Sequence, residues 1–150
     1  MLPFDRLVEA MDSWAKEHTE ATVFAQVGES KVQVRHMECR RMVTPAEYRQ
    51  RFEWADLVVS HVGMGTVITA VEVGKPLVLI ARRPELNEVT SAHQIATAAW
   101  LVGCGGLRIV SECHELPAAI AECAGMGALE NIESGTRPRL IQAIRDFISS

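Results

Sequence analysis

The sequence predicts a doubly wound α/β domain with a parallel sheet, and two observations carry that prediction. Two short apolar runs, Leu57–Ser60 and Leu77–Ala81, have the composition of buried strands and are joined by a segment of helical length. Buried strands joined by a helical crossover form a βαβ unit. The chain also alternates between the two patterns: helix, strand, strand, helix, strand, helix, strand, helix, strand, helix, helix. This order is typical of doubly wound domains with right-handed crossovers.

Length and composition predict a single domain over residues 1–150, with enough chain to bury a sizeable core. The net charge is −4 and no stretch is strongly basic, so nucleic acid is not the default partner. The four cysteines form no CxxC pair, which indicates neither a zinc site nor a disulfide framework. Cys113 and His114 could ligate a metal, but buried or idle thiols are the commoner arrangement.

The amino end of the sequence lacks the charged and apolar regions of a signal peptide. The longest weakly polar stretch, Ile95–Leu107, is interrupted by glycines and is too short for a membrane span. These features predict a cytoplasmic protein, which something else would have to anchor if it works at a membrane.

The first third of the chain predicts a helix and two strands. Apolar residues recur at helical spacing from Phe4 and end near His18, with charged residues on the opposite face. Thr22–Gly28 is then expected to be a buried strand closed by glycine, and Cys39–Val43 a second strand. The next helix starts with a clear signal, because Thr44 can cap it, a proline follows, and a glutamate three positions on completes a capping box. That helix is expected to end near Trp54.

The segment Thr66–Val73 is ambiguous from its residues alone. Its β-branched residues favour a strand by propensity, but the strands on either side should be parallel, and only a crossover joins parallel neighbours. We therefore predict a buried helix that stops at Gly74–Pro76. The remaining predicted elements, in chain order, are a polar loop Arg82–Thr90, a helix Ala92–Val102 capped by Ser91, a strand Leu107–Val110, a helix Leu116–Cys123, a loop Gly125–Gly135, and a closing helix capped by Thr136 with its apolar face at Leu140–Ile148.

The chain opens with a helix, whereas doubly wound domains usually open with a strand. Either a first strand is missing from this chain or the sheet has one strand fewer. We expect an open edge of this kind to favour a homodimer or a partner interface if it leaves an apolar patch.

Ligands of doubly wound sheets bind at the carboxyl ends of the strands. The loop Ser60–Thr66 falls at such an end, its glycines Gly63 and Gly65 would let a ligand approach the backbone, and the helix that follows presents its amides to phosphate. The pattern is neither GxGxxG nor a P-loop. A plain strand-to-helix turn is therefore the alternative reading of this loop.

Three other pieces are expected at the same edge: Gln26–Ser30, Arg82–Glu88 and Ser91–Gln94. Together with the glycine loop they suit a nucleotide diphosphate, because Arg82 and its neighbour supply charge while Glu88 and Gln94 can bond sugar hydroxyls. A solvated loop is the alternative for the arginine pair, and an ordinary first-turn position is the alternative for His93.

His61 is a candidate general base, because the ordinary pKa of histidine lies near neutrality. A histidine that only bonds the loop backbone is an equally good reading of this position. The sequence contains no Ser/His/Asp set, paired-carboxylate motif or metal cluster that stands out.

The residues Ser60-His-Val-Gly-Met-Gly-Thr66, Gly74-Lys-Pro-Leu77, the loop from Arg82 to Glu88, and His93-Gln94, in this order, resemble the C-terminal, donor-binding domain of glycosyltransferase family 28. The resemblance extends from Phe4 to about Ile120. It is strongest to short, free-standing members, namely the catalytic subunit of a dolichol-linked UDP-GlcNAc transferase and bacterial exopolysaccharide glycosyltransferase subunits.

This resemblance implies a Rossmann-like half of a GT-B enzyme that binds a UDP-sugar. The family's glycine loop falls on Gly63, Met64, Gly65 and Thr66, beside the diphosphate and sugar, and its His/Gln pair falls on His93 and Gln94. The turn that contains Gln26 and Gly28 would lie beside the nucleotide.

The sequence departs from the family at two places. Many relatives carry a ribose-binding glutamate three residues after the loop threonine, where this chain has Thr69, which favours the exopolysaccharide type. Relatives also begin with a strand and a Gly-Thr loop just before the segment that here starts at Met1-Leu2-Pro3-Phe4. The expectation is therefore a domain that lacks the usual first strand, through truncation or through a start assigned too far downstream.

The resemblance finally implies an inverting, metal-independent transferase subunit with no cofactor. Its donor would be a UDP-sugar, its acceptor a polyprenyl-diphosphate-linked saccharide, and its partner a membrane-anchored, acceptor-binding glycosyltransferase subunit that holds the chain at the membrane. The alternative is a non-catalytic interaction subunit that keeps the fold without turnover.

Overall fold

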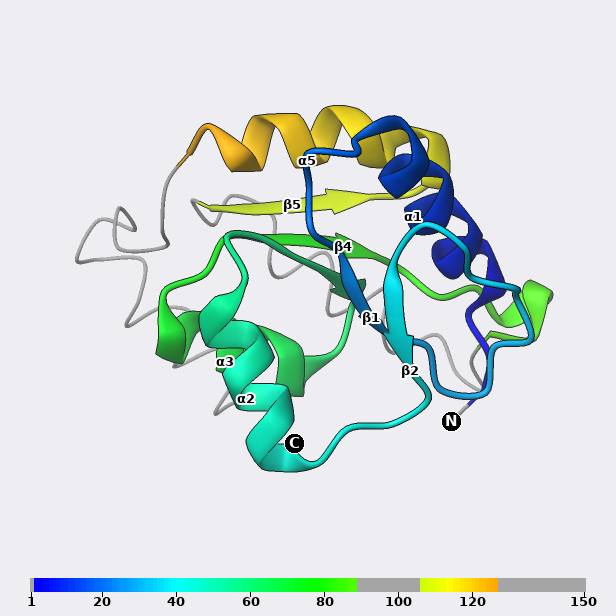
Figure 1. Cartoon of the computed structure of the whole chain (residues 1–150), viewed down its shortest axis with the longest axis horizontal. Helices are drawn as coiled ribbons and strands as arrows, with labels where there is room; N and C mark the ends of the chain where they lie inside the picture. The colour runs from blue at the N-terminus through cyan, green and yellow to red at the C-terminus, as the bar shows by residue number, and fades with distance from the viewer. Residues whose placement is uncertain (1, 89–105, 127–150) are drawn as a thin grey trace.

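Parallel strands flanked by helices form the structure, a computed structural model that describes residues 2–88 and 106–126. Figure 1 shows how these elements are arranged. In chain order they are α1 (Asp5–Glu17), β1 (Phe24–Gln26), β2 (Glu38–Arg40), α2 (Pro45–Trp54), β3 (Val58–His61), α3 (Met64–Val73), β4 (Leu77–Ile80), the 3₁₀ turn η1 (Pro84–Leu86), β5 (Leu107–Val110), the 3₁₀ turn η2 (Cys113–Glu115) and α5 (Leu116–Ala124). Within the described ranges no helix combines the length and apolar character needed to cross a bilayer.

The strands form two separate parallel sheets. One has three strands in the order β3–β4–β5, with Val58 opposite Leu77 and Leu77 opposite Leu107. The other pairs β1 with β2, placing Phe24 opposite Glu38. The parallel α/β class predicted from the sequence is confirmed. The strands nevertheless form two sheets rather than the single predicted sheet, because β1 and β3 do not pair with each other.

The strand β4 is the centre of the larger sheet, and all four of its residues are buried. Successive side chains of a strand point to opposite faces. Leu77 and Leu79 accordingly belong to a core cluster with α2 and α3, while Val78 and Ile80 belong to a second cluster with α1 and α5. Helices therefore cover both faces of this sheet, as in a doubly wound domain.

The segment after β3 is helical in spite of its β-branched residues. Since β3 and β4 are parallel neighbours, the chain between them must cross over. The resulting helix α3 ends at Gly74, whose φ of 70° and ψ of 36° lie in the left-handed region that glycine adopts without strain. Topology overrides local propensity here, and the predicted helix and its stop are confirmed.

The two strands predicted early in the chain exist but differ from the prediction in extent, and the first also differs in its predicted burial. The strand predicted at Thr22–Gly28 is limited to β1, which is only half-buried, and the one predicted at Cys39–Val43 starts at Glu38 and stops at Arg40, fully exposed. Both strands lie in the two-stranded sheet, which is not joined to the larger sheet. Neither strand is therefore covered by helices on both faces, as β4 is. The helix predicted at Ala92–Val102, the closing helix and most of the loop predicted at Gly125–Gly135 lie outside the described residues.

Candidate functional site

The turn between β3 and α3 lies at the carboxyl end of a central βαβ unit. It is shorter than the predicted loop Ser60–Thr66, because His61 still belongs to β3 and α3 already begins at Met64. Only Val62 and Gly63 separate the two elements. The glycine-containing segment is therefore the first turn of a helix rather than a free loop.

The amino end of α3 carries amide donors that the helix itself does not use. Gly63 is its cap residue and offers no side-chain acceptor, and the first amides of an α-helix have no intrahelical partner. The amides of Met64, Gly65 and Thr66 thus point out of the helix end, where the helix dipole is positive. Such an end suits a phosphate or another anion.

Four hydroxyl groups stand beside this helix end. The Thr66 Oγ1 lies 3.3 Å from the Tyr48 hydroxyl oxygen and 3.5 Å from the Ser60 Oγ, so α2, β3 and α3 are linked there. The Thr69 hydroxyl donates to the Gly65 carbonyl at 2.9 Å. Because its proton is used within the helix, Thr69 keeps only acceptor capacity in this conformation, unlike the carboxylate that the resemblance places here.

The two glycines of the turn have different surroundings. A Cβ added at Gly63 would lie 2.5 Å from Cε1 of His61, whereas one added at Gly65 would meet no atom within 4 Å. Gly63 is thus needed for the close approach of the histidine ring, and Gly65 leaves open space over the helix end. That space is what a ligand contacting the backbone requires.

We expect Gly63→Ala and Gly65→Ala to change stability in opposite directions. The first must displace the His61 ring and should lower the free energy of unfolding by about 1–3 kcal/mol, while the second removes a helical glycine without a clash and should raise it by about 0.5–1 kcal/mol. Urea denaturation of both variants measures the difference. Equal effects of the two substitutions would contradict the His61 contact.

His61 is the last residue of β3, and most of its side chain is withdrawn from solvent. Burial lowers the pKa of its imidazole, and the positive charge of Arg82 lowers that pKa further. The ring is therefore neutral at pH 7 and can accept a proton, which is what its predicted role as a base requires. That role stays a prediction.

The lowered pKa makes stability depend on pH. The ordinary histidine pKa is about 6.5, so on acidification the unfolded chain takes up the proton before the folded one does. The contribution of His61 is then fully present above pH ~6.5 and is lost as the pH falls below it. We expect wild type to lose more unfolding free energy than His61→Gln between pH 7.5 and pH 5, measured by urea titration; parallel losses in both proteins would contradict the burial of this ring.

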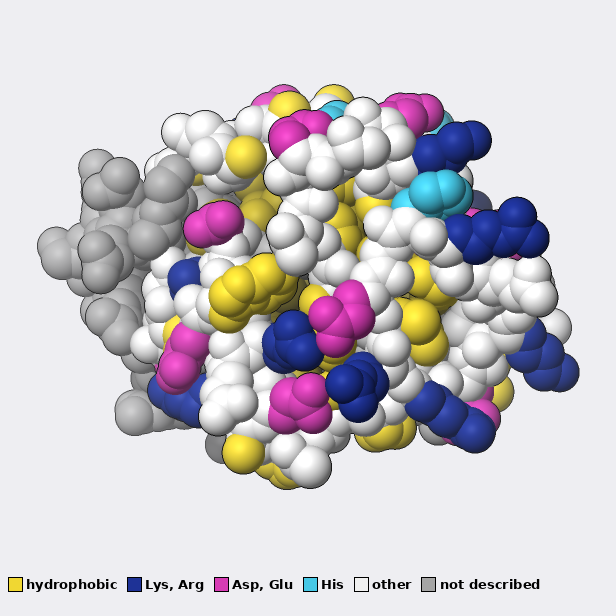
Figure 2. Space-filling view, in the orientation of Figure 1, with side chains coloured by type: hydrophobic (Ala, Val, Ile, Leu, Met, Phe, Trp, Pro, Cys, Tyr) yellow, Lys and Arg dark blue, Asp and Glu magenta, His cyan; other side chains and the backbone are white. Residues whose placement is uncertain are grey.

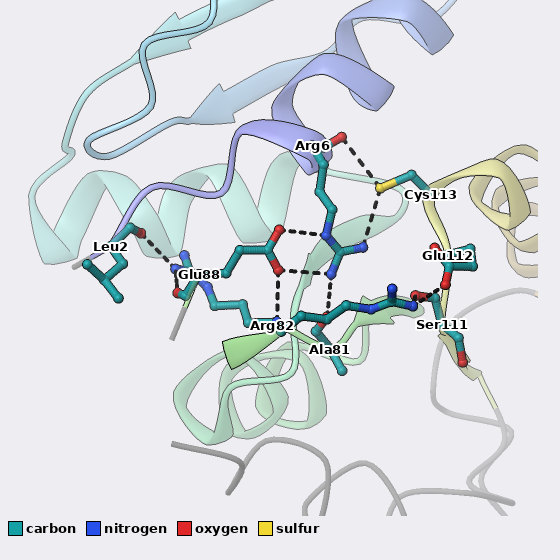
Figure 3. Close-up of polar contacts among 9 residues, drawn as sticks. Leu2, Arg6, Ala81, Arg82, Glu88, Ser111, Glu112 and Cys113 are labelled. Carbon is teal, nitrogen blue, oxygen red and sulfur yellow. Dashed lines mark hydrogen bonds and ion pairs between the residues drawn. The ribbon is translucent and has the colours of Figure 1, made fainter. Parts of the chain in front are cut away.

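Arg82 and Glu88 lie in a network that fixes the start of the loop after β4 (Figure 3). The Glu88 carboxylate accepts from Arg6 Nε at 2.6 Å, from Arg6 Nη2 at 3.0 Å and from the Arg83 amide at 2.8 Å. The Arg82 Nη1 donates to the Leu2 carbonyl and to the Glu88 carbonyl, both at 2.7 Å. Both side chains are buried, with 6% of Arg82 and 5% of Glu88 exposed.

These contacts tie α1 to the carboxyl edge of the sheet. Arg6 Nη2 also donates to the Ala81 carbonyl at 2.6 Å, and the Cys113 thiol donates to the Arg6 carbonyl at 3.5 Å. Burial raises the pKa of Cys113, so the thiol stays protonated.

Sequence reasoning missed Arg6, because a polar residue on an amphipathic helix carries no signal for a carboxylate 82 positions away. The predicted sugar-binding roles of Arg82 and Glu88 stay predictions.

The predicted turn after β1 is also at the carboxyl edge. The Gln26 Oε1 accepts from the Val43 amide at 3.2 Å, and Gly28 has a φ of 57° that favours glycine. Both residues line a cavity of about 1160 Å³, which the β3–α3 turn reaches from the other side. The predicted site residues that share this cavity are Gln26, Gly28, His61, Gly63, Gly65, Thr66, Thr69 and Arg82.

Four predicted site residues remain to be placed. Met64 contributes its amide to the helix end, and the side chain of Glu88 is held by Arg6. His93 and Gln94 lie outside the described residues. In the described part of the chain, no three His, Cys, Asp or Glu side chains come together as metal ligands would.

Comparison with known proteins shows the family of this chain. A family model described as the glycosyltransferase family 28 C-terminal domain matches residues 2–136. The chain is also 32% identical over 85 residues to the UDP-N-acetylglucosamine–N-acetylmuramyl-(pentapeptide) pyrophosphoryl-undecaprenol N-acetylglucosamine transferase of Zymomonas mobilis subsp. mobilis. That match covers 57% of this chain and 21% of the relative's length. Since the family match extends over most of its residues, this chain belongs to glycosyltransferase family 28 and corresponds to the family's C-terminal domain.

Proposed function

We propose that the chain is a glycosyltransferase subunit that binds a UDP-sugar, with the diphosphate at the amino end of α3. The observation that carries the proposal is that this helix end has no side-chain cap and opens onto the cavity shared with the turn after β1. A diphosphate there would accept hydrogen bonds from the amides of Met64, Gly65 and Thr66. Family membership supports a sugar nucleotide as the ligand.

In the proposed reaction the sugar is transferred with inversion and UDP departs. Negative charge grows on the diphosphate as the bond to the sugar breaks, and fixed amide donors with the positive end of α3 would stabilise that charge. This arrangement calls for no metal ion and no cofactor. His61 is kept as a candidate base only, because its neutral imidazole can accept a proton while its ring is largely enclosed.

We propose a lipid-linked saccharide as the acceptor. The name of the Zymomonas mobilis relative describes transfer of N-acetylglucosamine to a pyrophosphoryl-undecaprenol acceptor, which supports this class. The chain aligns with about a fifth of that relative's length. The acceptor would be presented by a membrane-anchored, acceptor-binding subunit, which would hold this chain at the cytoplasmic face of the membrane.

A transfer assay tests the proposed function. The chain is combined with membranes that contain its lipid-linked acceptors, a panel of radiolabelled UDP-sugars is supplied, and label in the lipid fraction is measured with and without the chain. We expect chain-dependent transfer from one UDP-sugar, lost with Gly65→Val. UDP binding without transfer from any donor would favour the non-catalytic interaction subunit, and absence of both would overturn the proposal.

A further inference from the structure

Tyr48 brings a hydroxyl group to the candidate site from α2. Its side chain packs against Phe52, with the two ring centroids 5.0 Å apart. Phe52 is buried and belongs to the core cluster that α2 and α3 share with the larger sheet. A tyrosine held in this way combines a fixed ring with a polar tip. The position of the Tyr48 hydroxyl is therefore set by the packing of the core.

The hydroxyl groups of Tyr48, Thr66 and Ser60 have a proton to spare. Thr66 Oγ1 contacts the other two oxygens, at 3.3 Å from that of Tyr48 and 3.5 Å from that of Ser60. Three hydroxyls carry three protons, and two contacts use at most two of them. These hydroxyls form no further hydrogen bond with the residues that the structure describes. At least one proton is thus available to a ligand.

Tyr48 is the member of this group best suited to give that proton to a ligand. Both contacts are longer than an ordinary O–H···O hydrogen bond of about 2.7–2.8 Å, so the hydroxyls can turn toward a stronger acceptor. A phenol donates more strongly than an aliphatic hydroxyl because it is more acidic. When Ser60 donates to Thr66 and Thr66 donates to Tyr48, each hydrogen bond strengthens the next. The available proton is then on the phenol.

Thr69 supplies an acceptor on the same face of α3. Its hydroxyl donates to the Gly65 carbonyl at 2.9 Å, which leaves the lone pairs of its oxygen available. Residues three apart on a helix are neighbours on its surface, so Thr69 stands beside Thr66, which Tyr48 contacts. A donor and an acceptor together match a ligand hydroxyl, which accepts one hydrogen bond and donates another. A phosphate oxygen only accepts, and it would leave the Thr69 oxygen unmatched.

The cavity of about 1160 Å³ is lined by Tyr48, Ser60, Thr66 and Thr69. Apolar residues of α1, α2 and α5 form much of its remaining wall. Figure 2 shows hydrophobic side chains between the backbone segments on this face of the molecule. In a site with largely apolar walls, the few polar groups fix the orientation of the ligand. These hydroxyls are therefore expected to decide how a hydroxyl-bearing ligand is held.

A UDP-sugar carries hydroxyl groups on both sides of its diphosphate, on the ribose and on the sugar that is transferred. The transferred sugar has to face an acceptor. Tyr48 and Thr69 instead lie where α2 and α3 pack on one core cluster, with Tyr48 half-buried against it. This position suits the part of the donor that leaves with UDP, which is the ribose.

We propose that Tyr48 binds the ribose of the donor, with its phenol donating to the 2′,3′-diol and the Thr69 oxygen accepting from the same diol. The inference rests on the proposed function, because it takes the diphosphate to lie at the amino end of α3. It adds a residue of α2 to the nucleotide site and assigns it a part of the ligand. Tyr48 then contributes to the choice of a ribonucleotide over a deoxyribonucleotide.

Calorimetric titration of wild type and Tyr48→Phe with UDP and with 2′,3′-dideoxy-UDP tests this assignment. The phenylalanine ring keeps the packing against Phe52 and removes only the hydroxyl. We expect the variant to bind UDP about fivefold more weakly than wild type does, as for the loss of one hydrogen bond, and to bind the dideoxy ligand equally well. Equal weakening for both ligands, or unchanged affinity for UDP, would overturn the ribose contact. Absence of UDP binding by wild type would overturn the proposed function itself.

Thr44→Ala is the matched control for a general loosening of α2. The Thr44 hydroxyl accepts from the Glu47 amide at 3.2 Å, so its loss weakens the start of the helix and leaves the phenol in place. We expect this variant to keep the wild-type ratio of the two affinities. A selective loss of UDP affinity in Thr44→Ala, equal to that in Tyr48→Phe, would assign the effect to the helix and overturn the contact.

The phenol can also be observed directly, because Tyr48 is the single tyrosine of the sequence. A chain labelled with ¹³C at the tyrosine Cζ gives one signal, whose chemical shift reports the hydrogen bonding of the hydroxyl. We expect saturating UDP to shift this signal and saturating 2′,3′-dideoxy-UDP to shift it much less. Equal shifts with the two ligands, or no shift with UDP, would contradict a hydrogen bond between Tyr48 and the ribose.

Discussion

Gly65→Val is expected to weaken UDP binding by at least about 100-fold, because a branched side chain would occupy the space over the amino end of α3. In other enzymes, removal of one preorganised donor to a developing anion lowers kcat on the order of 100-fold or more. The added valine side chain would block access to several amide donors at once. No atom lies within 4 Å of the added Cβ, so the fold should be retained. Isothermal titration calorimetry gives the affinity, and thermal melting gives the stability.

Gly125→Val is the matched control for that substitution. Gly125 follows α5, away from the β3–α3 turn, and an added Cβ there makes only ordinary contacts, the nearest at 3.6 Å from the Glu122 carbonyl. Its φ of −83° is one that any residue adopts. We expect unchanged UDP affinity in this variant. Equal affinities in Gly65→Val and Gly125→Val would move the nucleotide away from α3.

Arg6→Met is expected to lower the free energy of unfolding by about 3 kcal/mol, because it leaves the Glu88 carboxylate buried without its main partner. The side chains of Arg6 and Glu88 are 20% and 7% exposed, so the pair is screened only slightly. The lost contacts also release α1 from the Ala81 carbonyl. Urea denaturation measures the effect.

The double variant Arg6→Met/Glu88→Gln separates two effects of Arg6→Met on stability, namely the loss of the Arg6–Glu88 contact and the burial of an unpaired Glu88 carboxylate. We expect it to be more stable than Arg6→Met, since the uncompensated carboxylate is gone. Arg49→Met is the matched control, because Arg49 pairs with Glu53 where both side chains are about half exposed, and its loss should cost at most about 0.5 kcal/mol. A loss for Arg6→Met as small as that of Arg49→Met would contradict the structural role of the network.

The elements around β4 could be predicted because several constraints agree there. Continuous apolar runs predicted the strands β3 and β4, although β4 is buried throughout and β3 only in part. The requirement for a crossover between parallel strands predicted that α3 is a helix. At Thr44 the hydroxyl accepts from the Glu47 amide at 3.2 Å, as the capping signal predicted. Local chemistry and global topology point to the same structure in this part of the chain.

The rest depended on contacts between residues far apart in the sequence. Nothing in the pattern of Phe24–Gln26 distinguishes a strand with two covered faces from one beside a gap, so β1 was predicted to be buried. The role of Gly63 depends on where the His61 ring points, and the role of Glu88 depends on Arg6. The sequence therefore predicted that these residues follow the carboxyl ends of the strands, but it could not predict which of their side chains are held in internal contacts.

The central claim, that a UDP-sugar binds at the amino end of α3, is tested most directly by nuclear magnetic resonance. A ¹⁵N-labelled chain is titrated with UDP, and the shift of each backbone amide is followed to saturation. We predict the largest saturable shifts at Met64, Gly65 and Thr66. Saturable shifts confined to other amides, or none up to roughly millimolar UDP, would contradict the account.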